Sequence, residues 1–147
     1  EFLGKKLGKS LEEVTKILNK ESGVYGLSGG VSSDFRDLSA AMDEGNLLAK
    51  AALETYSYRV AKYIGSYVAA MNGVDIIAFT AGIGENDGRV RGMVGEYFEY
   101  LGTSIDPEKN KVRGEEAIIS NEGDKVTVMV VPTNEELAIA RETVKLV

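Results

Sequence analysis

The stretch Val74–Arg91, VDIIAFTAGIGENDGRVR, decides how the rest of the chain is arranged. It opens with an apolar run, 74–79, rich in β-branched residues, which predicts a buried strand of the parallel type. Gly82 and Gly84 then interrupt the run and permit backbone conformations and close approaches that other residues resist. A helical pattern begins near Arg89. The stretch therefore predicts a strand, a glycine turn and a helix, an arrangement that can direct backbone N–H groups toward a phosphate.

The composition bounds the class of protein. The chain has 147 residues, 44% of them hydrophobic and 27% charged, with a net charge of −6. These values are typical of one globular domain, and the absence of a basic patch argues against a nucleic-acid partner. No apolar run approaches the ~18 residues of a membrane span, and no signal peptide leads the chain. We therefore expect no membrane partner and a cytoplasmic location, which the absence of cysteine also fits.

The chain contains no histidine. This excludes Ser-His-Asp catalysis, HExxH metal sites and histidine acid–base chemistry among its own residues. Any chemistry here must use carboxylates, arginine, lysine, hydroxyl groups or a bound ion. The chain also begins at Glu1 rather than at methionine, which leads us to expect a fragment of a longer protein.

The remaining sequence predicts helices around the central stretch. Helical periodicity and capping signals place them at about 11–20, 35–42, 46–71, 89–101 and 134–146. Further strands are expected at 117–120 and 125–131, the second of them ended by Pro132. The predicted fold is α/β, with a short, mostly parallel sheet and packed helices in a single domain over residues 1–147.

The first candidate site is the glycine turn itself. It is not a Walker A loop, because GxxxxGK[ST] is absent, and Asp87 stands where the dinucleotide fingerprint needs its third glycine. Two interpretations stay open. The turn either joins a strand to a helix and does no more, or it binds a phosphate or nucleotide through its five residues, Gly82, Ile83, Gly84, Glu85 and Asn86.

The second candidate is the segment 28–37, SGGVSSDFRD. Ser32, Ser33 and Asp34 could cap the following helix, and Asp34 with Arg36 could form a surface ion pair. Alternatively, the Asp34 carboxylate could bind ribose hydroxyls while the Arg36 guanidinium binds a base or a phosphate.

The third candidate is the segment 131–136, VPTNEE. Thr133 and Glu136 are expected to form a capping box, which leaves Glu135 without a capping role. Glu135 would then lie at a helix N-terminus that follows the carboxyl end of a strand, the edge at which open α/β sheets bind ligands. Its carboxylate could hold Mg²⁺ directly or through water, or it could simply complement the helix dipole.

Together these segments resemble the C-terminal portion of the acetate kinases, in the acetate/propionate kinase group of the actin- and sugar-kinase-like ATPases. The matching stretches are ESGVYGLSGGVSSDFRD, KYIGSYVAAMNGVDIIAFTAGIGEN, VRGMV with YLG, and VVPTNEELAIARET. They follow one another in the expected order from about residue 10 to the end of the chain. The resemblance implies part of a ribonuclease-H-like, actin-like ATPase lobe.

The resemblance also implies roles by position. Asp34, Phe35 and Arg36 match the adenosine-contacting segment, with Phe35 beside the base. Residues 82–86 match the turn that lines the nucleotide site, and Glu135 matches the carboxylate that helps to hold Mg²⁺. The implied reaction is reversible transfer of the ATP γ-phosphoryl group to acetate, giving acetyl phosphate and ADP, in a homodimeric parent enzyme.

Other parts of that family's pattern are missing from this chain. The phosphate-binding arginines, the acetate pocket, the catalytic aspartate and a histidine lie in the earlier part of the enzyme, so we expect no catalytic residue here and no turnover by this chain alone. The early strands are missing as well, so the sheet should have an open edge. The alternatives are a propionate or butyrate kinase fragment, or a non-catalytic nucleotide-binding or oligomerising module in which Tyr56, Tyr63 and Tyr67 face a partner.

Overall fold

The computed structural model of the chain describes residues 1–146. The chain falls into two compact units, Glu1–Arg59 and Val60–Val147. The boundary between them lies inside one long helix, α5 (Leu47–Met71). The expectation that residues 1–147 form one domain therefore stays a prediction.

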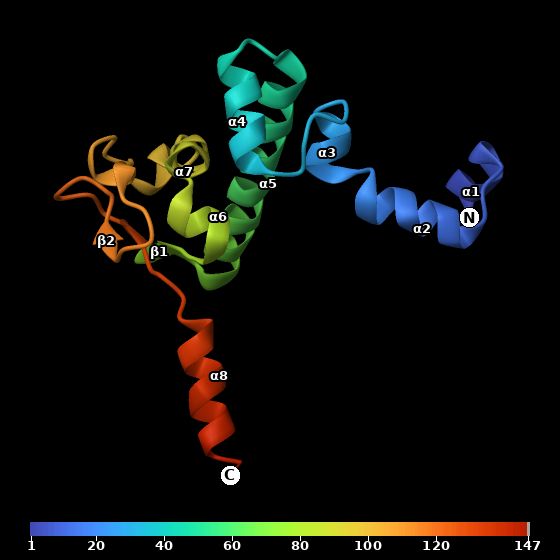
Figure 1. Cartoon of the computed structure of the whole chain (residues 1–147). Helices are drawn as coiled ribbons and strands as arrows, with labels where there is room; N and C mark the ends of the chain where they lie inside the picture. The colour runs from blue at the N-terminus through green and yellow to red at the C-terminus, as the bar shows by residue number, and fades with distance from the viewer. Residues whose placement is uncertain (147) are drawn as a thin grey trace. The chain divides into compact units, whose positions relative to one another are not determined.

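The first unit is helical. It contains α1 (Phe2–Leu7), α2 (Leu11–Lys20), α3 (Gly23–Leu27), α4 (Phe35–Asp43) and the first half of α5 (Figure 1). Its buried apolar side chains include Leu38 of α4 with Ala49 and Leu53 of α5, and the serines Ser28 and Ser57 are buried as well. A capping box starts α2: the Ser10 hydroxyl accepts from the Glu13 N–H, and the Glu13 carboxylate accepts from the Ser10 N–H.

Helix α5 buries a face of mainly small side chains. Asn46 caps its start, accepting hydrogen bonds from the N–H groups of Leu48 and Ala49 at 3.0 Å. The buried residues of the helix are Ala49, Ala52, Leu53, Ser57 and Ala61. Tyr63 and Tyr67 lie outside this face and are 59% and 62% exposed.

The second unit contains a mixed three-stranded sheet, in the order β1-β3-β2. Strand β1 (Ile76–Phe79) pairs in parallel with β3 (Thr127–Val130), and β2 (Ala117–Ile118) pairs antiparallel with the other side of β3. The α/β class is thereby confirmed, with all three strands inside the predicted stretches. Strand β1 is buried only on alternate residues, Ile77 and Phe79, and it forms an edge of the sheet.

Short helices connect the strands of this unit. Helix α6 (Ala81–Asn86) occupies the predicted glycine turn, and α7 (Gly88–Gly95) follows it directly. The helix predicted over 89–101 is interrupted, because α7 ends at Gly95, a residue with poor helix propensity, and a 3₁₀ turn follows at η1 (Glu99–Leu101). A second 3₁₀ turn, η2 (Lys109–Lys111), lies in the connection to β2.

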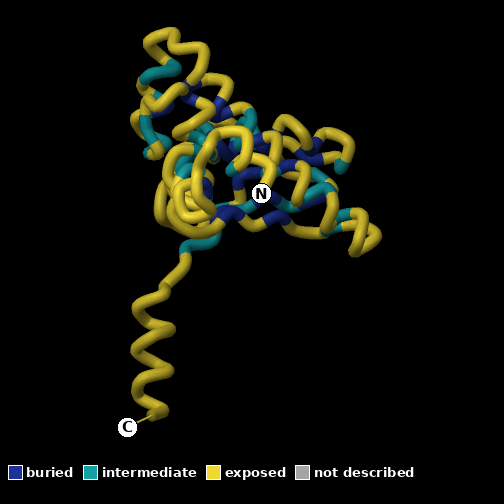
Figure 2. Tube along the Cα trace, turned by 90° about the vertical axis from the view of Figure 1, so that its right-hand side faces the viewer, coloured by how far each residue is buried: buried dark blue, intermediate teal, exposed yellow. Residues whose placement is uncertain are grey.

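Helix α8 (Glu135–Val144) follows β3 and has no buried residue, as its uniformly exposed trace in Figure 2 shows. Its N-cap is Asn134, whose side-chain oxygen accepts from the Leu137 N–H at 2.9 Å. The capping box predicted for Thr133 and Glu136 is therefore wrong, because the Thr133 hydroxyl is engaged elsewhere. Among residues 1–146, no helix is long and apolar enough to cross a membrane.

Candidate functional site

The backbone turns sharply between β1 and α6. Thr80 is extended, with φ −144° and ψ 174°, and Ala81 then adopts φ +59°. A left-handed conformation is uncommon for a residue with a side chain and costs of order 1–3 kcal/mol, so the surrounding structure must impose it. Neither Gly82 nor Gly84 has a positive φ. The expectation that these glycines supply the unusual backbone angles is therefore wrong, since Ala81 supplies them.

The glycines of the turn lack side chains for different reasons. A Cβ added at Gly84 would lie 3.2 Å from the carbonyl carbon of Phe79, so the close approach of α6 to β1 excludes a side chain there. A Cβ added at Gly82 would meet no atom within 4 Å. Nothing among the described residues requires glycine at position 82, although glycine in a helix is less stable than alanine by up to about 1 kcal/mol.

Four carbonyl groups of the turn accept hydrogen bonds within the second unit. The Gly82 carbonyl accepts from the Asn86 side chain at 3.0 Å, and the Ile83 carbonyl accepts from the Asp87 N–H at 2.9 Å. The Gly84 carbonyl accepts from the Arg91 guanidinium at 2.9 Å, and the Glu85 carbonyl accepts from the Gly114 N–H at 3.3 Å. The carbonyl ends of a single helical turn are normally left to water, so these bonds fix its conformation.

The Glu85 side chain joins the turn to the segment before α8. One carboxylate oxygen accepts from both the N–H and the hydroxyl of Thr133, each at 2.8 Å. These hydrogen bonds lower the pKa of Glu85, with a smaller contribution from the Ala81 N–H. Glu135 lies two residues beyond Thr133, in the first turn of α8. Its side chain is exposed, and no described residue bonds to its carboxylate.

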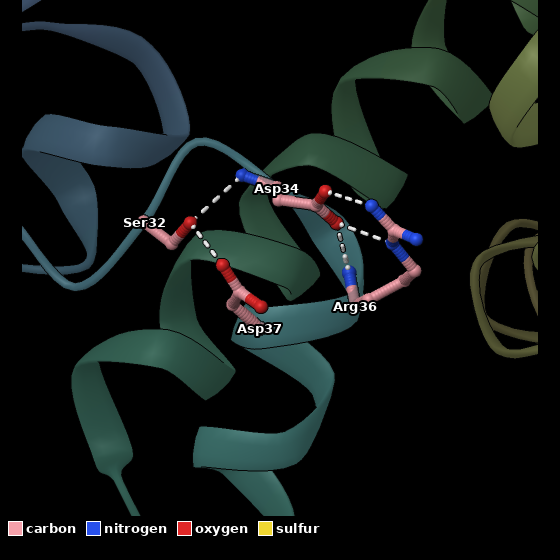
Figure 3. A network of polar contacts seen from close by, with 4 residues as sticks. All are labelled: Ser32, Asp34, Arg36 and Asp37. Atoms are coloured by element: carbon pink, nitrogen blue, oxygen red, sulfur yellow. Dashed lines mark hydrogen bonds and ion pairs between the residues drawn. The ribbon is translucent and has the colours of Figure 1, made fainter.

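In the first unit, Asp34 is the N-cap of α4 and pairs with Arg36 (Figure 3). Its carboxylate accepts from the Arg36 N–H at 2.8 Å and from the Arg36 guanidinium at 2.6 Å and 3.1 Å. The guanidinium hydrogen bonds, followed by the backbone one, lower the pKa of Asp34 from 3.8 to about 2. Ser32 donates to Asp37 and accepts from the Asp34 N–H, which fixes the entry to the helix.

Phe35 packs edge-on against Tyr56 of α5, with ring centroids 4.6 Å apart and planes at 71°. The ring is half-buried, while the Arg36 side chain beside it is 88% exposed. The capping and ion-pair interpretation of this segment is therefore realised. The exposed Arg36 guanidinium has further N–H groups besides the two that donate to Asp34.

The structure groups the predicted site residues in two sets. Asp34, Phe35 and Arg36 lie together at the start of α4 in the first unit. Residues 82–86 lie in the second unit, where the contact between Glu85 and Thr133 connects them to the segment that carries Glu135. Among the described residues, no group of three or more acidic, histidine or cysteine side chains could hold a metal ion without further ligands.

Sequence reasoning missed the residues that support the turn. They are Ala81, Arg91, Asn110 and Thr133. A signal did exist for Arg91, because it lies three and seven residues before the buried Val94 and Phe98, on what would be one apolar face of a helix. Thr133 was recognised only as a possible helix cap, and no local pattern distinguished Ala81 or Asn110.

Comparison with known proteins gives a consistent result. The Acetokinase family profile matches residues 1–141. The acetate kinase of Lachnoclostridium phytofermentans is 61% identical over the whole chain, and that of Agathobacter rectalis is 62% identical. The chain spans 37% of the length of each of these relatives.

Solved structures of related enzymes also resemble the chain. The acetate kinase of Porphyromonas gingivalis matches 98% of the chain with a TM-score of 0.90 and 44% identity. The propionate kinase of Francisella tularensis matches 96% with a TM-score of 0.86 and 40% identity. The chain covers 36% and 35% of these two structures, respectively.

Proposed function

The chain belongs to the acetokinase family, and we propose that it forms part of the adenine-nucleotide site of an acetate kinase. In the reaction we propose for the longer protein, an acetate oxygen forms a bond to the γ-phosphorus of ATP. The bond from that phosphorus to the β–γ bridging oxygen breaks, and ADP leaves. Catalysis of such a transfer depends mainly on positioning and on neutralising charge, so a rigid nucleotide site is a functional part in its own right.

One observation supports the nucleotide site above the others: Gly82 lacks a side chain that its own chain would accommodate. Its φ is not positive and no atom lies near its missing Cβ. The open space beside Gly82 suits a ligand that approaches the backbone closely, as phosphates do at glycine turns. The fixed carbonyls of the turn suit the same role, because a preorganised turn needs no rearrangement when the nucleotide binds.

We assign nucleotide contacts to two segments. Residues 82–86 would line the phosphate or sugar part of the nucleotide. Asp34, Phe35 and Arg36 would contact the adenosine, with the aromatic ring of Phe35 beside the base and the exposed Arg36 guanidinium available as a donor. Asp34 would act chiefly through Arg36, because its carboxylate is already occupied by that residue.

Mg²⁺ fits the exposed carboxylate of Glu135 at the start of α8. Mg²⁺ in kinases is commonly held by one or two carboxylates together with substrate phosphates and water. The exposed Glu135 carboxylate could supply such a ligand, directly or through water. Mg²⁺ would neutralise charge on the transferring phosphoryl group, and Glu135 would hold the Mg²⁺ ion in position. We therefore propose that Mg²⁺ binds here with the nucleotide and not with the protein alone.

The remaining assignments follow from the family. We propose that acetate and acetyl phosphate bind to parts of the longer protein outside this chain, that the longer protein is a cytoplasmic homodimer, and that the chain by itself does not turn over. A second candidate is a propionate kinase, which the match to the Francisella tularensis structure favours.

A titration of the chain with ADP, followed by calorimetry, tests the nucleotide site. We expect saturable binding with a Kd below about 1 mM, equivalent to roughly 4 kcal/mol. Glu135→Ala should weaken binding of Mg²⁺–ADP while leaving binding of metal-free ADP unchanged. Glu136→Ala, at the neighbouring position in α8, is the matched control and should change neither.

Two results would contradict the proposal. An absence of binding at millimolar ADP would rule out a nucleotide site in this chain. Formation of acetyl phosphate from ATP and acetate by the purified chain, at an enzyme-like rate, would show that it contains the catalytic groups we place elsewhere.

A further inference from the structure

Arg91 of α7 is the largest fully buried side chain in the second unit, with 0% of its surface exposed. Its guanidinium makes four hydrogen bonds. They run to the side chain of Asn110 at 2.8 Å, the carbonyl of Asn110 at 2.7 Å, the carbonyl of Val112 at 2.8 Å and the carbonyl of Gly84 at 2.9 Å. All four acceptors are uncharged oxygens.

A buried guanidinium with such partners constrains its surroundings. Burial lowers the pKa of Arg91, yet an arginine keeps its charge in a protein. The buried charge is tolerable only while its N–H groups remain bonded, so the two segments that supply the acceptors, α6 and residues 110–112, are held in one arrangement. An apolar side chain of the same size could fill this space, but it could not fix the direction of the Gly84 carbonyl.

Asn110 completes the arrangement. Its side-chain oxygen accepts from Arg91, and its amide nitrogen donates to the Gly88 carbonyl at 2.7 Å. Gly88 lies at the junction of α6 and α7, where an added Cβ would be 2.7 Å from the Asn110 carbonyl oxygen. The η2 segment therefore lies directly against this junction and is bonded to α7, while Arg91 extends the connection to α6.

We propose that Arg91 and Asn110 are positioning residues that hold the 82–86 turn in its nucleotide-binding conformation. Neither residue contacts the nucleotide in this scheme. They act through the Gly84 carbonyl, which lies at the centre of the turn. This inference rests on the proposed nucleotide site, but the conformational part of it is testable without nucleotide.

The test compares Arg91→Met and the milder Asn110→Ala with Val94→Ala. Val94 is fully buried on the same helix as Arg91, so its truncation destabilises the unit without removing a bond to the turn. The first measurement is amide hydrogen exchange without nucleotide, at a temperature where all variants are folded by circular dichroism. We expect exchange at Glu85 and Asn86 to be at least about tenfold faster in Arg91→Met and several-fold faster in Asn110→Ala, relative to Val128 in β3.

The second measurement is ADP affinity. We expect Arg91→Met to raise the Kd for ADP at least about tenfold, Asn110→Ala to raise it less, and Val94→Ala to leave it within about twofold. Arg91→Lys, which can reach one acceptor but lacks the planar fork, should recover part of the affinity.

The two measurements separate the possible failures. If the unaltered chain does not bind ADP, the proposed function is lost, and the exchange rates still decide whether Arg91 and Asn110 hold the turn. Equal exchange and equal affinity in Arg91→Met and the unaltered chain would overturn the inference. The inference would also be overturned if Val94→Ala changed exchange at Glu85 and Asn86 and the Kd for ADP as much as Arg91→Met does.

Discussion

At the scale of the residue, the two glycines of the turn show that one residue type can have two purposes. Gly84 is required by the protein, because the backbone of Phe79 occupies the space of a side chain. Gly82 is not required by any described residue. Packing therefore explains why residue 84 is glycine, while a bound ligand better explains the glycine at position 82.

This distinction predicts opposite effects for the same substitution. Gly82→Ala should leave stability unchanged or raise it by up to about 1 kcal/mol, because alanine favours helix, while ADP affinity falls. Gly84→Ala should destabilise the chain by roughly 1–3 kcal/mol, because a strand backbone 3.2 Å away has little room to move. Urea unfolding and ADP titration measure the two effects. Full ADP affinity in Gly82→Ala would contradict our explanation of that glycine.

The pair formed by Asp34 and Arg36 predicts a pH dependence. The folded-state pKa of Asp34 is depressed from 3.8 to about 2, so its contribution to stability is complete above the ordinary value and is lost as the pH falls from 3.8 toward 2. Arg36→Gln should raise the pKa of Asp34 only partway, because the N–H of residue 36 still donates to the carboxylate. Carboxyl NMR titration measures this shift, and Lys50→Gln, which removes a cation that pairs with Glu54, should produce none.

At the scale of the element, α6 is a single helical turn held from two directions. Arg91, which is itself bonded to η2, donates to the Gly84 carbonyl, and the Gly114 N–H donates to the Glu85 carbonyl. On its side-chain face, Glu85 bonds to Thr133, immediately before the N-cap of α8. Such a short helix has little stability of its own, so these contacts determine its conformation.

The contact between Glu85 and Thr133 connects the 82–86 turn to the segment that carries Glu135. Thr133→Val removes the hydroxyl donor and keeps the backbone donor, so the pKa of Glu85 should rise partway toward 4.5. Because its pKa is depressed, the Glu85 carboxylate stabilises the folded state above pH 4.5, and this contribution is lost as the pH falls below that value. Thr133→Val should therefore make the free energy of unfolding less sensitive to acid. NMR titration of Glu85 gives the pKa. An unchanged pKa would show that the hydroxyl contributes nothing.

At the scale of the whole molecule, several large apolar side chains remain exposed. On α5, Tyr63, Tyr67 and Met71 form a stripe at helical spacing, between 59% and 62% exposed. On α8, Ile139 and Val144 are 66% and 74% exposed. Exposed apolar surface of this kind favours association with other protein surfaces, and the chain spans only 37% of the relatives it matches.

We therefore predict that the isolated chain associates with itself. Sedimentation velocity should give a mass above 15.8 kDa that increases with protein concentration. Tyr67→Glu should reduce this association by placing a charge within the α5 stripe. Ala69→Glu, on a different face of the same helix, is the control and should have less effect. A mass of 15.8 kDa at every concentration would contradict the prediction and would also count against an oligomerising role for the α5 stripe.

The sequence by itself determined the α/β class, the strand–turn–helix order and the family of the chain. Apolar runs and helical periodicity act over a few residues, so β1, β3 and α5 lie inside the predicted segments. The candidate segments around Asp34, Gly82 and Glu135 were also visible as local motifs. The predicted helix boundaries were less accurate, as the end of α7 at Gly95 and the N-cap of α8 at Asn134 show.

Only the tertiary structure decided what holds the glycine turn. The bonds that matter join Arg91 to Val112 and Glu85 to Thr133, residues 21 and 48 positions apart. The positive φ of Ala81 and the crowding at Gly84 arise in the same way, from the approach of α6 to β1. Sequence periodicity reports which face of an element is apolar. It does not report which distant carbonyl a buried guanidinium will meet, because that depends on how the folded segments pack.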